Sequence, residues 1–137
     1  MLRKNAKIEL LRRVPLFSGC SKRELAEIAL IADEIDVASG KTLIREGERG
    51  RQFIVIIDGS VKVSKKGRSV PIRGGAEFFG EIALLSDAPT NATVTTTSPV
   101  RALVVVDRGF RELIERSPGI QIRVLRSLAE RLAPDAL

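Results

Sequence analysis

The chain has 137 residues, 44% of them hydrophobic and 29% charged, a composition that fits one folded domain with a buried core. Its single cysteine, Cys20, excludes an internal disulfide, and the absence of histidine excludes a zinc site and Ser-His-Asp or Cys-His triads. The longest wholly apolar runs have five residues, against about 20 for a membrane span, and no secretory segment is visible. We therefore expect a cytoplasmic domain without a membrane span.

The net charge of +6 is concentrated at the N-terminus. Residues 1–23 hold seven basic side chains and one acidic one, whereas residues 24–100 hold nine basic and eleven acidic ones. A contact with nucleic acid or a membrane surface is one interpretation of such a segment. A solvated helix face beside a missing partner is the other, and it is the one we favour. Because the chain has no Trp or Tyr, the stacking platform of single-strand binders is also weak.

Two short helices are predicted before the period of the hydrophobic pattern changes. Over residues 4–13, apolar side chains at i,i+3 and i,i+4 spacing predict an amphipathic helix that ends before Pro15. The second helix begins at Ser21, whose hydroxyl can cap it while the Glu24 side chain reaches back to the backbone. Apolar residues from Leu25 to Ile31 then supply its buried stripe.

Beyond Asp33 the sequence is typical of short strands separated by turn residues. Seven apolar or β-branched runs predict strands at residues 35–37, 42–44, 53–57, 61–64, 69–72, 92–97 and 101–106. Between two of them, Asp58-Gly59 tolerates a positive φ angle and is expected to form a hairpin turn. Seven or eight strands of this length and spacing favour a sandwich or a jelly-roll barrel.

Helical patterns return after the last strand. Asp107 is expected to cap a helix over residues 110–116, and Ser117-Pro118 begins another helix, which ends at Pro134. The predicted fold class is therefore α+β, in one domain over residues 1–137. An eight-stranded β jelly-roll barrel occupies residues 33–106, with N-terminal helices in residues 1–32 and two C-terminal helices in residues 107–133.

One segment, from Gly74 to Val94, concentrates the residues that suit a ligand. Gly80 lets the backbone approach a ligand closely, and residues 81–85 form a single helical turn whose free amides suit a phosphate. Glu81 would repel that phosphate unless its carboxylate engages another group, for which a sugar hydroxyl is apt. Phosphate and ribose together indicate a nucleotide. Alternatively, the segment only connects two strands, with Glu81 capping the turn.

The stretch from Phe79 to Leu85, followed by residues 89–94, resembles the phosphate-binding cassette of cyclic-nucleotide-binding domains. This family includes protein kinase A regulatory subunits, catabolite-activator-type regulators and cyclic-nucleotide-gated channels. The resemblance covers nearly the whole chain, because residues 14–17, 46–48 and 53–61 also match, and the two last helices resemble the family's B and C helices.

The resemblance implies roles for individual cassette residues. Glu81 matches the glutamate that binds the ribose 2′-hydroxyl, and the position after Phe79 starts the run of amides that hold the cyclic phosphate. Those amides belong to Gly80, Ile82 and Ala83.

The cassette departs from the family pattern at its second half. Thr90 stands where family members have an arginine that pairs with a phosphate oxygen, and Asn91 stands where they have a small residue bordering the phosphate. A charge-assisted hydrogen bond contributes about 1.5–3 kcal/mol, so its loss weakens cyclic nucleotide binding by roughly 10- to 150-fold. Thr90 and Asn91 are neutral hydrogen-bonding groups that could hold a phosphate weakly or a nucleoside. Arg68 or Arg73 could replace the missing cation.

Three further residues are placed near the base of the ligand. Val70 and Ile72 are candidates for an apolar wall, although ordinary core positions look the same. By its place in the last helix, Arg131 matches an arginine that stacks on the purine in some prokaryotic channel domains. An ion pair between Arg131 and Asp135 is the alternative.

These features predict a regulatory binding module rather than an enzyme. We expect cAMP as its ligand, no metal and no other cofactor, with ligand binding that folds the last helix over the barrel. An effector domain or protein partner would then be reached through the basic N-terminal helix or the last helix, without direct nucleic-acid binding. The alternative is a degenerate domain that binds a nucleoside or no nucleotide and serves as a protein-interaction scaffold.

Overall fold

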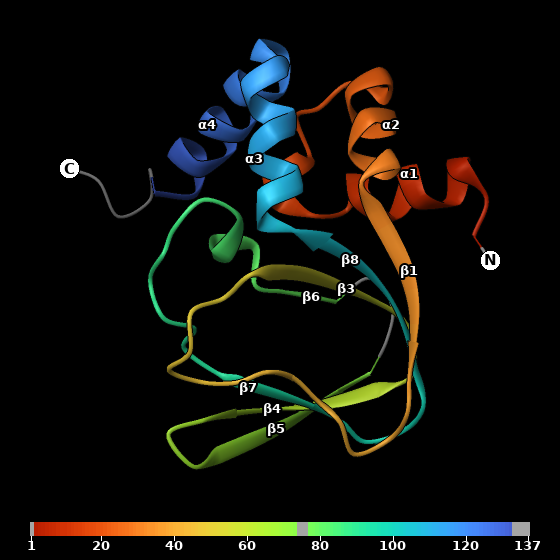
Figure 1. Ribbon diagram of the computed structural model, residues 1–137, viewed down its shortest axis with the longest axis vertical. Coiled ribbons are helices and arrows are strands. Elements are labelled where there is room, and N and C mark those ends of the chain that lie inside the picture. Colours follow the sequence, from red (N-terminus) through yellow and green to blue (C-terminus); the bar gives the residue numbers. More distant parts are fainter. Residues whose placement is uncertain (1, 74–76, 133–137) are drawn as a thin grey trace.

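The computed structural model describes residues 2–73 and 77–132, which form an α+β fold (Figure 1). Two four-stranded antiparallel sheets face each other, and a layer of helices covers the outer face of the sheet that contains β3 and β8. One sheet has the order β1-β8-β3-β6, with strands Ala32–Val37, Val100–Val106, Gln52–Asp58 and Phe78–Phe79. The other has the order β2-β7-β4-β5, with strands Thr42–Ile44, Thr93–Thr96, Ser60–Lys65 and Arg68–Arg73. The expected jelly-roll barrel with flanking helices is confirmed.

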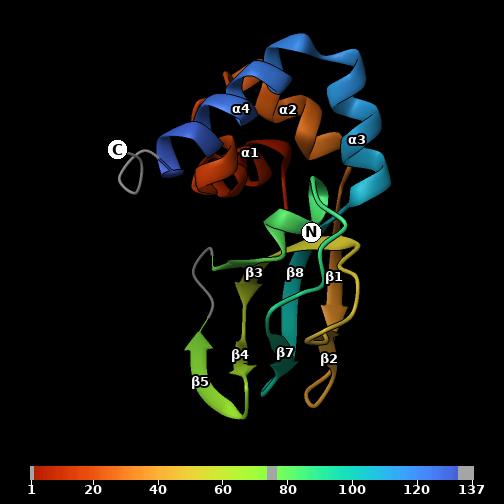
Figure 2. The same cartoon turned by 90° about the vertical axis from the view of Figure 1, so that its left-hand side faces the viewer.

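The helical layer combines the two ends of the chain (Figure 2). It contains α1 (Lys4–Arg12), the 3-10 helix η1 (Pro15–Phe17), α2 (Lys22–Leu30), α3 (Asp107–Arg116) and α4 (Pro118–Leu132). The predicted capping box at α2 is confirmed, because Ser21 Oγ accepts from the Glu24 amide at 3.1 Å and Glu24 Oε1 accepts from the Ser21 amide at 2.8 Å. Such a cap satisfies two amides that the first helical turn leaves without partners.

The central strands β3 and β8 are buried on both faces, which explains their uninterrupted apolar runs. Phe53 and Val55 of β3 pack against the helical layer, together with Phe17 and Phe110. The Phe17 ring centroid lies 5.8 Å from that of Phe53 and 5.7 Å from that of Phe110. Ile54 and the alternate residues of the same strands fill the space between the two sheets. Helices and barrel therefore share β3 and β8 as a common wall.

The expected hairpin at Asp58-Gly59 is wrong. Strands β3 and β4 flank this dipeptide but belong to different sheets, so the chain turns a corner there. Gly59 has φ +100°, and a Cβ atom at this position would lie 2.4 Å from the backbone oxygen of Pro99, so close packing requires glycine. The tight hairpin is the next one, where Lys66 (φ 51°) and Gly67 (φ 81°) join the paired strands β4 and β5.

Most strand bounds differ from the predicted ones by a residue, and the structure departs further from the prediction at β1, at β6 and at the start of α3. Strand β1 begins at Ala32, because its polar first half still pairs with β8. Strand β6 was not predicted, since two residues are too few to show a period. Asp107 is the first residue of α3 rather than its cap: Val106 takes the extended N-cap conformation, and the Asp107 amide donates to the Arg51 carbonyl at 2.9 Å.

Candidate functional site

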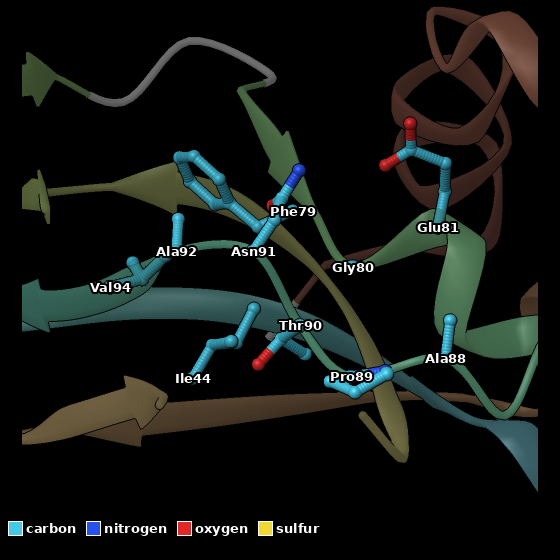
Figure 3. A pocket seen from close by; sticks show the side chains of 10 residues that line it. All are labelled: Ile44, Phe79, Gly80, Glu81, Ala88, Pro89, Thr90, Asn91, Ala92 and Val94. Carbon is cyan, nitrogen blue, oxygen red and sulfur yellow. The ribbon is translucent and has the colours of Figure 1, made fainter. Parts of the chain in front are cut away.

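A cavity of about 230 Å³ opens between the two sheets at the cassette (Figure 3). Its lining comes from the end of β2, from β6, from the start of η2 (Glu81–Leu84), from the segment before β7, and from β7 itself. The lining residues are Ile44, Phe79, Gly80, Glu81, Ala88, Pro89, Thr90, Asn91, Ala92 and Val94. The cavity is smaller than the ~300–1,000 Å³ of pockets that enclose a drug-sized ligand. It therefore suits part of a ligand, such as a sugar phosphate, whose remainder projects outward.

Gly80 forms the corner at which the chain leaves β6 and enters η2. Its φ is +84°, and a Cβ atom there would lie 2.5 Å from the backbone oxygen of Gln52 in β3. The predicted close backbone approach is therefore made to the protein's own strand. Because β6 pairs with β3 through Ile54–Phe79 and Val55–Phe78, this corner fixes the beginning of the cassette against the rigid central strand.

Glu81 is the first residue of η2, and the helical turn predicted over residues 81–85 is present as Glu81–Leu84. The side chain is partly buried and lines the cavity. In the view of Figure 3, the carboxylate of Glu81 and the carboxamide of Asn91 point to the same side of the Gly80 backbone. Among the described lining residues, Glu81 is the sole charged side chain. The cavity thus carries a hydrogen-bond acceptor that suits a sugar hydroxyl.

Thr90 is held by the loop between β2 and β3. Its hydroxyl donates to the carbonyl oxygens of Arg45 and Glu48, the latter at 3.0 Å, and its amide donates to Glu48 O at 2.9 Å. The Thr90 carbonyl in turn accepts from the Gly47 amide at 2.8 Å. A threonine hydroxyl has one proton, and here that proton is directed to the loop. The idea that this hydroxyl holds a phosphate is therefore not supported by its geometry.

Asn91 contrasts with its neighbour. Its side chain is exposed, lines the cavity, and makes no hydrogen bond within residues 2–73 and 77–132. Both amide hydrogens and the carbonyl oxygen of the carboxamide are therefore available to a ligand.

The remaining predicted site residues are placed by their backbone only. Ile82 and Ala83 lie in η2, and Val70 and Ile72 lie on β5 opposite Val63 and Val61 of β4. Arg131 lies near the end of α4. The side chains of these five residues, and that of Arg73, fall outside the described structure, as does the whole of Asp135. Arg68 is exposed and does not line the cavity.

The last helix is not over the cavity in this structure. Helix α4 packs against η1 and α3 within the helical layer, and it contributes no described residue to the cavity lining. In the second turn of α4, Arg123 Nε lies 3.7 Å from Glu24 Oε1 of α2. The arrangement is an open one, with the last helix held on the N-terminal helices.

An ionic junction that was not predicted joins the cassette to α3. Asp87 Oδ1 lies 2.8 Å from Arg49 Nη2 and 3.3 Å from Arg111 Nη2, and Arg111 Nε donates to the Leu84 carbonyl at 3.2 Å. Hydrogen bonds from Arg111, the larger contribution, and from Arg49 hold the pKa of the Asp87 carboxyl below its ordinary value. The three side chains come from distant parts of the chain, so no local pattern could have indicated them.

Replacing Asp87 by Asn is expected to lower the melting temperature by a few degrees at neutral pH, since exposed ion pairs contribute little. A lowered carboxyl pKa stabilises the fold above the unfolded-state value of about 4, and this contribution is lost as the pH falls through the lower folded-state value. The difference in melting temperature between wild type and Asp87→Asn should therefore become smaller as the pH is lowered from about 5 to about 3. Melting curves over that range, with the exposed Asp33→Asn as control, test this. A gap independent of pH would contradict it.

Cys20 does not belong to the site. Burial, aided by the nearby Glu24 carboxylate and opposed by Arg123, raises the pKa of the Cys20 thiol to about 11. Such a thiol is protonated at neutral pH and is a poor nucleophile. Cys20 therefore serves as a small buried side chain of the hydrophobic core.

Comparisons with known proteins agree with this architecture. The family model of the cyclic nucleotide-binding domain matches residues 34–117. The chain is 32% identical over 129 residues to the CRP-like cAMP-activated global transcriptional regulator of Mycobacterium tuberculosis, covering 90% of this chain and 58% of that protein. It is 33% identical over 120 residues to the cAMP-dependent protein kinase regulatory subunit of Eremothecium gossypii, and the match covers 86% of this chain and 25% of that protein.

Solved structures show the same likeness. The N-terminal domain of a transcriptional regulator from Streptomyces coelicolor A3(2) has a TM-score of 0.80 and 30% identity, with 92% of both chains covered. The regulatory domain of Toxoplasma gondii PKA, crystallised with cAMP, has a TM-score of 0.71 and 29% identity, covering 80% of this chain and 44% of that one. The chain therefore belongs to the cyclic nucleotide-binding domain family.

Within residues 2–73 and 77–132, no helix is both long and apolar enough to cross a bilayer. The same part of the chain contains no group of three metal-ligating side chains. The chain spans 58% of the mycobacterial regulator and 25% of the kinase subunit, so the activity of those whole proteins is not transferred to it.

Proposed function

We propose that this chain is a regulatory, non-enzymatic module that binds cAMP in the cassette cavity. The observation that carries the proposal is the cavity lined by Gly80, Glu81 and Asn91, with the Glu81 carboxylate and the Asn91 carboxamide on the same side of the Gly80 backbone in Figure 3. Glu81 would accept from the ribose 2′-hydroxyl, and the backbone amides of Gly80, Ile82 and Ala83 would surround the phosphate. Relatives named for cAMP among regulators and kinase subunits support this ligand.

We further propose that the ligand acts by moving α4. The cavity is small and open, so a purine base attached to the ribose would project from it and would offer apolar surface for a lid. Helix α4 would supply this lid after leaving η1, with Arg131 over the base and Val70 and Ile72 as the opposite wall. A ligand shifts such an equilibrium only by its difference in affinity for the two states. The movement would pass to an effector domain or partner through α4 or the basic α1.

A second candidate has an observation in its favour. The described lining contains one acidic side chain and no basic one, and an acidic cavity disfavours an anionic ligand relative to a neutral one. A nucleoside such as adenosine would keep the contact with Glu81 and avoid that repulsion. In the limiting case the domain binds neither ligand and serves as a protein-interaction scaffold.

Calorimetric titration with cAMP, cGMP and adenosine separates these readings. We expect cAMP to bind in the micromolar range, and Glu81→Ala to weaken it at least about tenfold, because a hydrogen bond to a charged group contributes about 1.5–3 kcal/mol. Glu77→Ala is the matched control, because its exposed carboxylate lies four residues earlier and outside the cavity. Tighter binding of adenosine than of cAMP would favour the nucleoside. If no ligand gives binding heat or shifts the melting temperature, the protein-interaction scaffold is the function that remains.

A further inference from the structure

The first two turns of helix α4 meet one carboxylate of the N-terminal helices, that of Glu24. Arg123 Nε in α4 lies 3.7 Å from Glu24 Oε1. Gly119 of α4 packs so closely on the same side chain that a Cβ atom at this position would overlap Glu24 Oε2. The Glu24 side chain is 16% exposed, so the contact is largely withdrawn from water. We call the contact of Glu24 with Gly119 and Arg123 the latch.

The cap of helix α2 fixes the Glu24 carboxylate independently of α4. Its Oε1 atom accepts from the Ser21 amide at 2.8 Å, and the Glu24 amide donates to Ser21 Oγ at 3.1 Å. These two hydrogen bonds restrict the rotamers of the side chain whether or not α4 lies beside it. Because the carboxylate is already ordered, little side-chain entropy is lost when α4 binds to it.

The latch is a weak contact, as a contact that opens needs to be. Arg123 Nε is buried and has no hydrogen-bond acceptor within residues 2–73 and 77–132, because 3.7 Å is too long for a hydrogen bond to Glu24. A buried N–H group without an acceptor favours any arrangement in which it regains one. The ion pair therefore holds α4 on α2, and the unsatisfied N–H group weakens that hold.

We propose that Glu24 holds α4 in the open position through the latch and thereby lowers the affinity of the cassette cavity for its ligand; this regulation of the site rests on the proposed function. A protein whose binding-competent conformation is only partly populated binds with an affinity reduced by that fraction. Glu24 does not belong to the described cavity lining. It is a positioning residue, which acts on the ligand only through the place of α4.

Glu24→Gln removes the charge of the latch and keeps the cap, because glutamine also serves at this position of a capping box. The full chain with this substitution should bind cAMP about two- to fivefold more tightly than wild type in calorimetry, the range for a partly exposed ion pair. Ile120 and Val124 still bury α4 against the N-terminal helices, so the gain is limited. Arg123→Gln should give the same gain, and Arg123→Lys, which keeps the charge, less than about twofold.

Gly119→Ala tests the latch without changing any charge. The added Cβ atom would displace the Glu24 carboxylate from α4, whereas alanine favours a helix more than glycine does. If Glu24 only stabilised the fold, this substitution would leave cAMP affinity unchanged or lower it. Because the latch opposes ligand binding, we expect affinity to rise about two- to fivefold, as with Glu24→Gln.

The matched control lies on the same helix. Arg126 is exposed on α4, so Arg126→Gln removes the same charge as Arg123→Gln and should bind cAMP as the wild type does. Amide hydrogen exchange without ligand provides a second readout: α4 should exchange about two- to fivefold faster in Glu24→Gln and Gly119→Ala than in Arg126→Gln. Thermal unfolding establishes that each variant is folded.

The possible results separate the inference from the proposed function. Tighter cAMP binding and faster α4 exchange in both Glu24→Gln and Gly119→Ala support the inference, also where wild type itself shows no binding. If wild type binds cAMP and either variant binds it equally or more weakly, the inference is overturned while cAMP binding stands. Tighter binding without faster exchange also overturns it, because affinity would then have changed without release of α4. If neither wild type nor any variant binds cAMP, the proposed function fails and the inference fails with it.

Discussion

Thr90→Arg is expected to bind cAMP about 10- to 150-fold more tightly than wild type, because a guanidinium forms a charge-assisted hydrogen bond worth about 1.5–3 kcal/mol with a phosphate oxygen. Adenosine, which has no phosphate, should gain nothing. The cAMP affinity of this variant should also fall with added salt, because salt screens the attraction between the guanidinium and the phosphate. Calorimetry with both ligands at two salt concentrations measures these effects.

The same substitution has a cost that the structure makes specific. Without the Thr90 hydroxyl, the carbonyls of Arg45 and Glu48 lose a donor each, which should lower the free energy of unfolding of the unliganded protein by about 1–2 kcal/mol. Thr42→Arg adds the same charge at an exposed position outside the cavity and serves as the control. Unchanged or weaker cAMP binding by Thr90→Arg would mean that the phosphate does not lie beside residue 90.

Gly80→Ala is expected to lower the free energy of unfolding by about 3 kcal/mol or more and to abolish ligand binding. Two effects combine: a side chain at positive φ costs about 1–2 kcal/mol, and the added Cβ would meet the Gln52 backbone oxygen at 2.5 Å. Backbone atoms of the central strand are unable to yield, so β6 and the start of the cassette must move.

Gly40→Ala separates these two effects. Gly40 has φ +83°, against +84° for Gly80, but a Cβ atom added there meets nothing within 4 Å. It should therefore cost about 1 kcal/mol, the backbone contribution alone. Chemical denaturation of both variants provides the comparison. Equal destabilisation would contradict the view that the corner at Gly80 is fixed by its contact with β3.

Much of the fold could be predicted because it depends on local patterns. The five-residue apolar runs in β3 and β8 are long for strands of a half-exposed sheet, and burial on both faces explains them. Ser21 and Glu24 predicted the start of α2 correctly, because a capping box is a local pattern contained within four residues. Gly80 was singled out correctly, although its close approach is to Gln52 rather than to a ligand.

What could not be predicted depends on contacts between distant segments. A positive φ at Gly59 is visible in the sequence, but whether the chain turns back or crosses to another sheet is decided by where β8 lies. The sequence allowed the hydroxyl of Thr90 to hold a phosphate or a nucleoside, because the carbonyls to which it donates lie 42 and 45 residues earlier and no local pattern reveals them. The Asp87 junction with Arg49 and Arg111 spans 38 and 24 residues.

Backbone NMR spectroscopy of the full chain, titrated with cAMP, tests the central claim most directly. The amides of Gly80, Glu81 and Asn91 should show the largest chemical-shift changes, and these changes should saturate. Smaller changes are expected along α4 as that helix leaves η1. Glu81→Ala should remove these shifts at the same cAMP concentration, and Glu77→Ala should retain them. A spectrum in which the cassette amides stay unchanged at millimolar cAMP, or in which the shifts cluster on α1 alone, would contradict binding at this site.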